Sequence, residues 1–473
     1  MKVFFVYIFL LATLFCSAQP VNQYFEKIRT DEAALTAFFN LMPKGGDLHH
    51  HYSGSVYPET LLEHAIANNF YLNRESMTVV KEKPSVGKWE QFSTIQQSGN
   101  LEQVKEQIIQ QWSIKNFNHL NEASNTHFFS SFEKFKAAND DSFAMGLMEL
   151  KNRAVSENCS YIETQLNTMS TTISTTNFEP LNDQLRKLQI TKNEKAVFQL
   201  LDSIYVYLIK QNITKDAQEF NADFVEKLHD SLKIDDDKFT MRFQNYVLRF
   251  MEPVDLFKQL VLAFISANKS AIIDGVNIVS PENGDTALQD YWLHMIMYKY
   301  CHNRFPKVRY SMHAGELTMN LVKPEELKWH IRSAVYTAKA NRIGHGVAIA
   351  YEDSSYDLLR YMARQKIAVE INLASNAFIL NIKDSRHPIL LYKSFGVPIV
   401  LSTDDAGILR TTLTEQYVLL AKKYTAFSYS DIKNIVYNGI RYSFIEDENV
   451  KKKLLKNLDE RFRVFESTFY MEN

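Results

Sequence analysis

Apolar, β-prone runs alternate along this chain with stretches whose apolar residues recur every three or four positions. A short continuous apolar run is typical of a strand buried on both faces, whereas the three-to-four spacing predicts a helix with one buried side. The first strand-like run ends at His51, and seven more follow it, at residues 159–166, 240–249, 271–279, 307–313, 341–346, 366–371 and 397–402. Alternation of strand and helix implies a parallel sheet. Eight repeats predict an α/β fold of the closed (β/α)8 TIM barrel type.

Several segments are expected to be helical outside this simple repeat. Residues 19–42 carry apolar and aromatic side chains at helical spacing and predict a helical N-terminal extension. A helix is expected to begin near Pro58, because proline is favoured in the first helical turn. Residues of about 75–150 and 180–236 are mostly helical in pattern. We interpret both as helical insertions within a barrel domain that covers residues 43–473.

The first eighteen residues have a different character. Lys2 precedes an apolar stretch from Val3 to Phe15, which is followed by the small residues Ser17 and Ala18. A charged start, a short hydrophobic run and small residues at its end are typical of a secretory signal peptide. We therefore expect cleavage after Ala18 and a secreted or periplasmic protein. Stable membrane insertion is not expected, because the run is short for a bilayer span. A buried N-terminal helix is the less favoured alternative.

Charge and cysteine content argue against some classes of protein. The formal net charge is −2 and no long basic run occurs, so the chain lacks the electrostatic pattern of a nucleic-acid-binding protein. Cys159 and Cys301 are the cysteines beyond the predicted signal peptide, and the sequence leaves open whether they pair. They form no C-x-x-C motif. This argues against the His/Cys/Cys zinc site of cytidine-type deaminases.

Histidines and a carboxylate follow two of the predicted strands. His49 and His51 are two positions apart, so on a strand they point to the same side, and His50 points the other way. His313 ends the run KVRYSMH, and Glu316 follows after an Ala-Gly turn. Alone, each has an ordinary explanation: a solvated histidine cluster, a hydrogen-bonded core histidine, or an acid near a helix N-terminus.

Two later patches complete the pattern. His345 lies between two glycines in RIGHG, and Asp404 and Asp405 follow the last predicted strand. A loop histidine and a pair of helix-capping acids are again the ordinary alternatives. In a barrel, however, the strands end at one face, where side chains from distant positions meet. Three imidazoles and a carboxylate can hold one divalent metal beside a water, with a general acid and base nearby. The combined pattern predicts a metal-dependent hydrolase.

Together these patches resemble the adenosine deaminase family of metal-dependent amidohydrolases. The motifs occur in the family's order, from P-K-x-x-x-L-H-x-H at 43–51 through H-A-G-E at 313–316, R-I-G-H-G at 342–346 and S-N at 375–376 to T-D-D at 403–405. The resemblance runs from about Pro43 to Tyr417, and it places Ala374–Asn376 on the seventh strand. The MPKGGDLHHH opening, the signal peptide and the HFFSSFEKF stretch look like the secreted, growth-factor-related branch of the family.

The resemblance implies one catalytic zinc per chain. Its ligands would be His49, His51, His313 and Asp404. Amidohydrolases with two metals need a lysine at the end of a middle strand, and the fourth strand here ends at 277–280 without one. A single metal is therefore expected.

The resemblance also implies a reaction, the hydrolytic deamination of adenosine or 2′-deoxyadenosine to inosine or 2′-deoxyinosine and ammonia. A zinc-bound water would attack C6 of the purine while Glu316 protonates N1. His345 would orient that water and help to deprotonate it, and Asp405 would hydrogen-bond N7. This agrees with elementary chemistry, since zinc lowers the pKa of its water to about 7.

Three departures from the family pattern surround the expected substrate rather than the metal. Ser53 stands where the family commonly has an acid that contacts the ribose, and its hydroxyl can still bind a sugar. Ser280 replaces a glycine whose backbone contacts N3, and Gln165 replaces an arginine. They leave two alternatives to adenosine deamination: deamination of another 6-aminopurine, and a non-catalytic binding protein of growth-factor type. The expected partner is a small purine nucleoside, and the sequence leaves a homodimer open.

Overall fold

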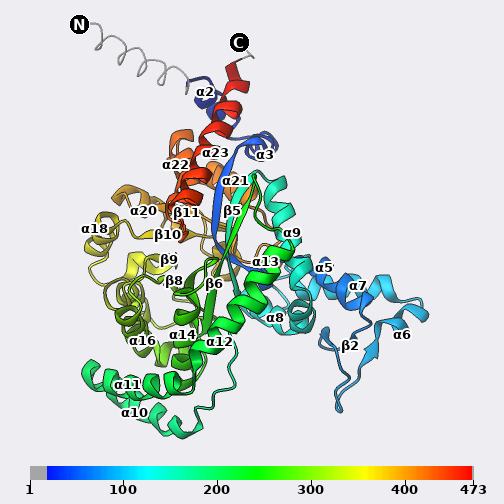
Figure 1. The fold of residues 1–473 in the computed structure, drawn as a ribbon. Coiled ribbons are helices and arrows are strands. Elements are labelled where there is room, and N and C mark those ends of the chain that lie inside the picture. The colour runs from blue at the N-terminus through cyan, green and yellow to red at the C-terminus, as the bar shows by residue number, and fades with distance from the viewer. Residues whose placement is uncertain (1–18, 471–473) are drawn as a thin grey trace.

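Eight parallel strands pair side by side in the order in which they occur along the chain (Figure 1). The computed structural model describes residues 19–470. The barrel strands are β1 (Lys44–His51), β5 (Cys159–Asn167), β6 (Thr240–Leu248), β7 (Ile273–Val279), β8 (Arg309–Ala314), β9 (Arg342–His345), β10 (Ala368–Ile371) and β11 (Ile399–Leu401). The (β/α)8 barrel predicted from the sequence is confirmed, as are its eight strands.

The sheet closes between its last and first strands. The Asp404 N–H donates to His49 O at 2.9 Å, and the His51 N–H donates to Asp404 O at 3.1 Å. This seam joins two segments that carry predicted metal ligands.

Strand β1 forms for a different reason from its neighbours. Most of the other strands are rich in apolar residues, whereas β1 reads KGGDLHHH and is nevertheless almost wholly buried. Its glycines allow helix α22 (Tyr429–Arg441) to approach the strand backbone closely. A Cβ at Gly46 would lie 2.7 Å from the carbonyl oxygen of Gly439, so no larger residue fits there.

Helices cover the outside of the barrel (Figure 1). Those between or after the strands are α9 (Phe143–Ser156), α14 (Pro253–Ala267), α15 (Asp285–Gln289), α16 (Tyr291–Arg304), α17 (His330–Ser333), α18 (Ser355–Gln365), α19 (Leu373–Ile379), α20 (Ile389–Phe395), α21 (Leu413–Lys423), α22 and α23 (Glu448–Ser467). Strand β5 leads to β6 through α10 (Pro180–Ile190), α11 (Glu194–Lys210), α12 (Ile213–Glu219), the π-helix η2 (Phe220–Glu226) and α13 (Lys227–Ser231).

The connection from β1 to β5 forms a lobe that projects from the barrel (Figure 1). It contains α4 (Tyr52–Ser55), α5 (Pro58–Ala67), α6 (Phe92–Gln97), α7 (Leu101–Trp112) and α8 (Ser124–Asp141). Helix α5 begins at Pro58, as predicted. A small antiparallel sheet of β2 (Tyr71–Asn73), β3 (Thr78–Val80) and β4 (Glu90–Gln91) was not expected in a region whose pattern is mostly helical.

The helices α2 (Gln19–Ile28) and α3 (Glu32–Leu41) pack against the C-terminal helices. Phe38 meets Tyr429 and Phe465 edge to face, with ring centroids 6.0 and 5.1 Å apart. The predicted signal peptide falls on residues 1–18, outside the described residues. Among helices within 19–470, none is both long and apolar enough to cross a membrane. Cys159 and Cys301 are buried free thiols.

Candidate metal centre

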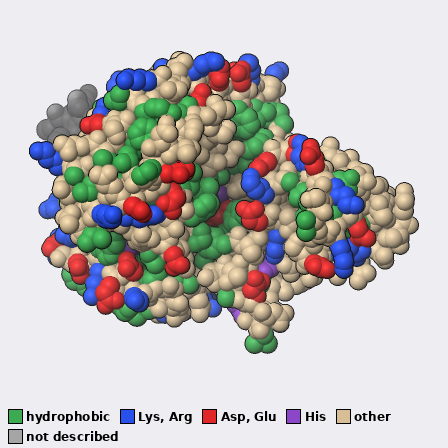
Figure 2. Space-filling model, turned by 90° about the horizontal axis from the view of Figure 1, so that it is seen from below, with side chains coloured by type: hydrophobic (Ala, Val, Ile, Leu, Met, Phe, Trp, Pro, Cys, Tyr) green, Lys and Arg blue, Asp and Glu red, His purple; other side chains and the backbone are tan. Residues whose placement is uncertain are grey.

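Residues at the C-terminal ends of the barrel strands surround a cavity of about 470 Å³. Figure 2 looks onto this side of the molecule, where the surface is hollowed between the barrel and the projecting lobe. The cavity is lined by two kinds of side chain. The polar lining residues include His51, His313, Glu316, His345, Asp404 and Asp405. Helix α8 supplies much of the apolar wall through Phe128, Phe129, Phe132 and Phe135.

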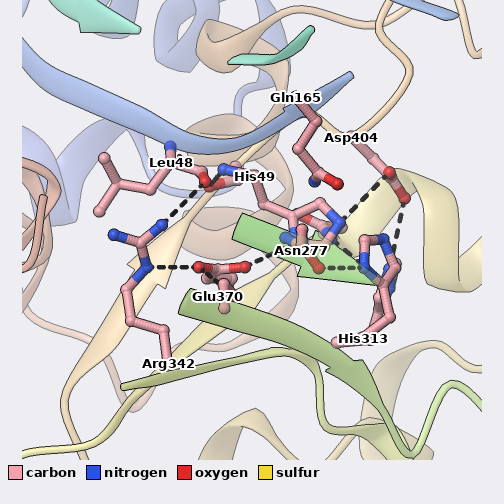
Figure 3. Close-up of polar contacts among 12 residues, drawn as sticks. Leu48, His49, Gln165, Asn277, His313, Arg342, Glu370 and Asp404 are labelled. Carbon is pink, nitrogen blue, oxygen red and sulfur yellow. Dashed lines mark hydrogen bonds and ion pairs between the residues drawn. The ribbon is translucent and has the colours of Figure 1, made fainter. Parts of the chain in front are cut away.

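The four predicted metal ligands lie together (Figure 3). His313 Nε2 lies 3.2 Å from His51 Nε2, which lies 3.4 Å from His49 Nε2. Asp404 Oδ1 lies 3.2 Å from His51 Nε2 and 3.5 Å from His49 Nε2. His49 and His51 come from β1, His313 from β8, and Asp404 follows β11.

The four donor atoms are close enough together to share one cation. A tetrahedron with bonds of about 2.1 Å, as zinc makes to nitrogen and oxygen, has edges of about 3.4 Å. Four of the six donor separations, from 3.2 to 3.5 Å, lie near that edge length, and all four donor atoms lie within 4.8 Å of one another. Three imidazoles and a carboxylate are also a donor set that zinc accepts.

The outer ring nitrogens of two of these histidines have hydrogen-bond acceptors. His49 Nδ1–H donates to Glu370 Oε2 at 2.6 Å, and His313 Nδ1–H donates to Asn277 Oδ1 at 3.0 Å. These bonds fix the tautomer that leaves the Nε2 lone pair facing the cluster. The Gln165 amide lies 3.2 Å from His51 Nε2.

Glu370 is itself held by a buried arginine. Arg342 Nε donates to Glu370 Oε1 at 2.5 Å (Figure 3). Arg342 Nη2 donates to Glu163 Oε1 at 2.5 Å. Burial alone would raise the pKa of Glu370, but the Arg342 charge and the His49 hydrogen bond outweigh it and hold that pKa at about 2. Glu370 therefore stays ionised as the acceptor for His49.

Glu316 and His345 face each other beside Asp404. His345 Nδ1 lies 3.6 Å from Glu316 Oε1, and His345 Nε2 lies 3.8 Å from Asp404 Oδ2. Burial and the Asp404 charge raise the pKa of Glu316 well above its ordinary value. Burial lowers the pKa of His345 to about 3. A protonated carboxyl beside a neutral imidazole is a pair suited to moving protons.

Asp405 is buried, and its Oδ1 has no hydrogen-bond partner among the described residues. Burial and the neighbouring Asp404 charge raise the pKa of Asp405 well above its ordinary value. A buried polar atom without a partner is uncommon and suits a ligand contact. Gly54 makes room for this carboxyl, since a Cβ there would lie 1.7 Å from Asp405 Oδ1.

The predicted substrate contacts Ser53 and Ser280 both line the cavity. Ser280 has a φ of 83°, in the left-handed region that favours glycine. The chain therefore keeps a glycine-like backbone at a position where the family usually has glycine.

Two sequence-based assignments are resolved by the structure. His50 points away from the cavity, and its Nδ1 lies 2.9 Å from Thr164 Oγ1, as the strand alternation predicted. The assignment of Ala374–Asn376 to the seventh strand is wrong. These residues lie on α19, directly after β10, because the chain turns into a helix at the strand end. That turn brings Asn376 Nδ2 to 2.9 Å from His345 Nδ1.

Several residues that support the site were not identified as functional from the sequence. Glu370, Asn277 and Asn376 each contact a histidine of the cluster or its neighbour. Glu370 carried a usable signal, since it is a charged residue inside the short apolar strand AVEI. Glu282 carried none, because it lies in a loop and its partners come from other segments.

The family model described as adenosine deaminase matches residues 208–461, just over half of the chain. An adenosine deaminase from Clostridium acetobutylicum is 32% identical over 155 residues, covering 32% of this chain and 42% of the relative. The chain spans less than half the length of this relative and of two other curated adenosine deaminases that it matches.

Solved structures share the fold at low sequence identity. A zinc-bound amidohydrolase from Burkholderia ambifaria is 17% identical, with a TM-score of 0.53 over 92% of this chain and 95% of the other. Arabidopsis ADAL in complex with GMP is 19% identical, with a TM-score of 0.55 over 90% and 98%. The motifs at the strand ends, the barrel and the family match agree, and this chain belongs to the adenosine deaminase family of the amidohydrolase superfamily.

Proposed function

We propose that this protein is a zinc-dependent deaminase that converts adenosine or 2′-deoxyadenosine to inosine or 2′-deoxyinosine and ammonia. One observation carries the proposal: four side chains that could hold a metal, the buried acid Glu316 and the buried acid Asp405 all line or adjoin one cavity, and Asp405 Oδ1 has no hydrogen-bond partner among the described residues. Four donor atoms that all lie within 4.8 Å of one another favour a single metal ion, and their chemistry suits zinc.

Each residue beside the ligand cluster has a role in that reaction. Zinc bound there would supply a Lewis acid that makes hydroxide accessible at neutral pH. Glu316, kept protonated by its surroundings, gives a proton to purine N1 as C6 is attacked. His345, kept neutral by burial, orients the attacking water and accepts its proton. Asp405 holds the purine through N7.

The charges around the cavity favour a nucleoside over a nucleotide. Lys136 is the cation that lines the cavity among the described residues, and it is paired with Asp140 at 2.5 Å. Glu133 adds another negative charge to the lining. A 5′-phosphate would meet these acids without a free cation to offset its charge. The Arabidopsis structure with GMP therefore does not predict a nucleotide substrate for this chain.

Ser53 and Ser280 leave a second candidate substrate class, another 6-aminopurine derivative. Ser53 carries a shorter, uncharged side chain where an acid would hold the ribose, so sugar binding is expected to be weaker. The left-handed backbone of Ser280 supports retention of the backbone contact to N3. We place adenosine first because Glu316, His345 and Asp405 match the family pattern and the Ser280 backbone stays glycine-like.

Export is part of the proposal. The charged start, apolar stretch and small residues of positions 1–18 support cleavage after Ala18, and the secreted, growth-factor-related branch remains a prediction. Intact mass and N-terminal sequencing of protein from a secreting host test it. A mature chain that begins at Gln19 is the expected result, and an uncleaved intracellular chain contradicts it.

The catalytic proposal is tested by turnover of adenosine, 2′-deoxyadenosine, adenine, AMP and methylthioadenosine, with zinc content measured on the same samples. Adenosine and 2′-deoxyadenosine should be converted fastest. Glu316→Gln should lower kcat by at least about 100-fold, because removing a general acid costs about that much, while zinc content stays near one per chain. Absence of turnover with every aminopurine by zinc-loaded protein would favour a non-catalytic binding protein.

A further inference from the structure

We propose that Glu282 and His330 are positioning residues that clamp the backbone of Gly315 and Glu316 and so aim the Glu316 carboxyl into the cavity. The inference rests on the proposed function of Glu316 as the proton donor. Neither residue lies among the motifs that identify the family in this chain. Glu282 follows β7 in the loop that begins at Ser280, and His330 begins α17.

Glu282 grips the loop after β8 with both carboxylate oxygens. The Gly315 N–H donates to Glu282 Oε1 at 3.0 Å, and the Glu316 N–H donates to Glu282 Oε2 at 2.8 Å. The carboxyl group is 1% exposed, so water does not compete for these bonds. Two parallel bonds to consecutive amides fix the direction in which the chain leaves His313. They therefore set where the Glu316 side chain begins.

His330 holds Glu282 from the other side. Its Nδ1–H donates to Glu282 Oε1 at 2.6 Å. The imidazole stacks on Tyr291 with ring centroids 3.7 Å apart and planes 19° apart, and the Tyr291 hydroxyl donates to His330 O at 2.9 Å. The ring is thus held in place by contacts that do not involve the cavity.

Charge favours the same arrangement. Burial opposes ionisation of both groups, yet the hydrogen bond from His330 keeps the pKa of Glu282 below its ordinary value, and the same bond raises the pKa of His330. The buried Arg249 guanidinium lies 4.0 Å from Glu282 Oε1 and donates through Nη2 to His313 O at 2.8 Å. One network therefore touches the backbone of both His313 and Glu316.

The clamped turn has little freedom to adapt if the clamp is removed. Gly315 has a φ of 73°, and a Cβ there would lie 2.5 Å from Ile331 Cδ1. The turn is a left-handed one packed directly on α17, the helix that begins with His330. A shift of α17 or of Glu282 is therefore passed to the Glu316 backbone. Misplacement of a reacting group by about 1 Å can cost on the order of 100-fold in rate.

Paired substitutions at His330 separate hydrogen bonding from packing. His330→Asn keeps a donor near the position of Nδ1 but loses the ring that stacks on Tyr291. His330→Phe keeps the stacking ring and loses the donor. If His330 acted only by packing on Tyr291, the Phe variant would lower kcat less than the Asn variant. The inference predicts the reverse: kcat for adenosine within about 3-fold of wild type for the Asn variant, and at least about 10-fold lower for the Phe variant.

Glu282→Gln tests the other end of the clamp, with Glu352→Gln as its matched control. Glu352 is another buried glutamate that binds α17, accepting the Ile331 N–H at 2.6 Å, but it makes no hydrogen bond to the 313–316 turn. Glu282→Gln should lower kcat by about 10- to 100-fold with KM nearly unchanged. Glu352→Gln should keep kcat within about 3-fold of wild type even where it lowers the melting temperature.

Amide hydrogen exchange at Gly315 and Glu316 provides a measurement that does not depend on activity. Exchange there should be at least about tenfold faster in Glu282→Gln and His330→Phe than in wild type, and near wild type in His330→Asn and Glu352→Gln. If no aminopurine is converted, the proposed function fails, and this exchange pattern still decides whether the clamp exists. Three results would each overturn the inference. They are exchange that is unchanged in Glu282→Gln and His330→Phe, equal kcat for the two His330 variants, and a loss of zinc as large as the loss of kcat.

Discussion

Replacing Gly54 by alanine should disable the site through a single steric contact. A Cβ at Gly54 would lie 1.7 Å from Asp405 Oδ1, 2.4 Å from its Cγ and 2.6 Å from its Cβ. Rotating the Asp405 side chain relieves the first two contacts but not the third, because the Cβ position is fixed by the backbone. Either helix α4 or the turn that carries Asp405 must therefore move.

The structure gives the size of that movement and its cost. Raising the contact with Asp405 Cβ from 2.6 Å to an ordinary separation of about 3.4 Å or more needs a backbone shift near 1 Å. Both segments are fastened together, since the Gly407 and Ile408 N–H groups each donate to Gly54 O at 2.9 Å. Overpacking of this kind costs about 1–3 kcal/mol of stability. Misplacement by about 1 Å at a reacting centre costs on the order of 100-fold in kcat/KM.

The assay is kcat/KM for adenosine together with urea unfolding of the same preparations. Gly284→Ala is the control, because Gly284 has an ordinary φ of −66° and its Cβ would lie 3.4 Å from the nearest atom. It should change stability by less than about 1 kcal/mol and leave turnover intact. Gly54→Ala with wild-type kcat/KM and wild-type stability would show that the Asp405 carboxyl need not occupy its observed position.

Three further predictions concern the metal, the backbone and a buried lysine. Removal of the proposed zinc by chelation should lower the melting temperature by several degrees, since a ligand at 100 times its Kd adds about 2.7 kcal/mol of stability. Added zinc should restore the melting temperature, and Asp404→Asn should show a smaller response. Ser280→Gly should raise the free energy of unfolding by about 1 kcal/mol by relieving the left-handed backbone, measured by urea unfolding with an unchanged slope. Burial lowers the pKa of Lys44 from 10.5 to about 8, so between these pH values the unfolded chain binds more protons than the folded one. The stability of the wild type should therefore rise with pH across that window, by on the order of 3 kcal/mol relative to Lys44→Met. A wild-type stability advantage that stays constant from pH 8 to 10.5 would contradict the last prediction.

The barrel could be predicted from the sequence because most of its strands are rich in apolar residues. A strand with packed core inside and helices outside needs apolar residues on both faces, and the run VPIVL before Ser402 shows this clearly. The sheet of β2, β3 and β4 could not be predicted in the same way. Strands of two or three residues are too short to show a period, so their pairing is decided by tertiary contacts.

The clustering of the four candidate metal ligands could be predicted for a related reason, while the contacts that support them could not. The C-terminal ends of parallel strands meet at one face, so polar residues that follow strands can be grouped without knowing the structure. The partners of their outer ring nitrogens depend on which side chains meet across the barrel. Asn277 lies within β7, 36 residues before His313, and nothing in either segment indicates that they pair.

Closure of the barrel and assembly of the candidate metal site depend on the same few bonds. His345 and Asp404 have φ values of 62° and 64°, a left-handed backbone that costs a residue with a Cβ on the order of 1 kcal/mol each. At Asp404 this conformation is held by the two hydrogen bonds to β1 that close the sheet. Those bonds also fix Asp404 relative to His49 and His51, so the ligand spacing is set by the seam itself. A change that loosens the seam, such as the displacement expected in Gly54→Ala, should therefore release zinc at lower denaturant concentrations than those that unfold the rest of the barrel.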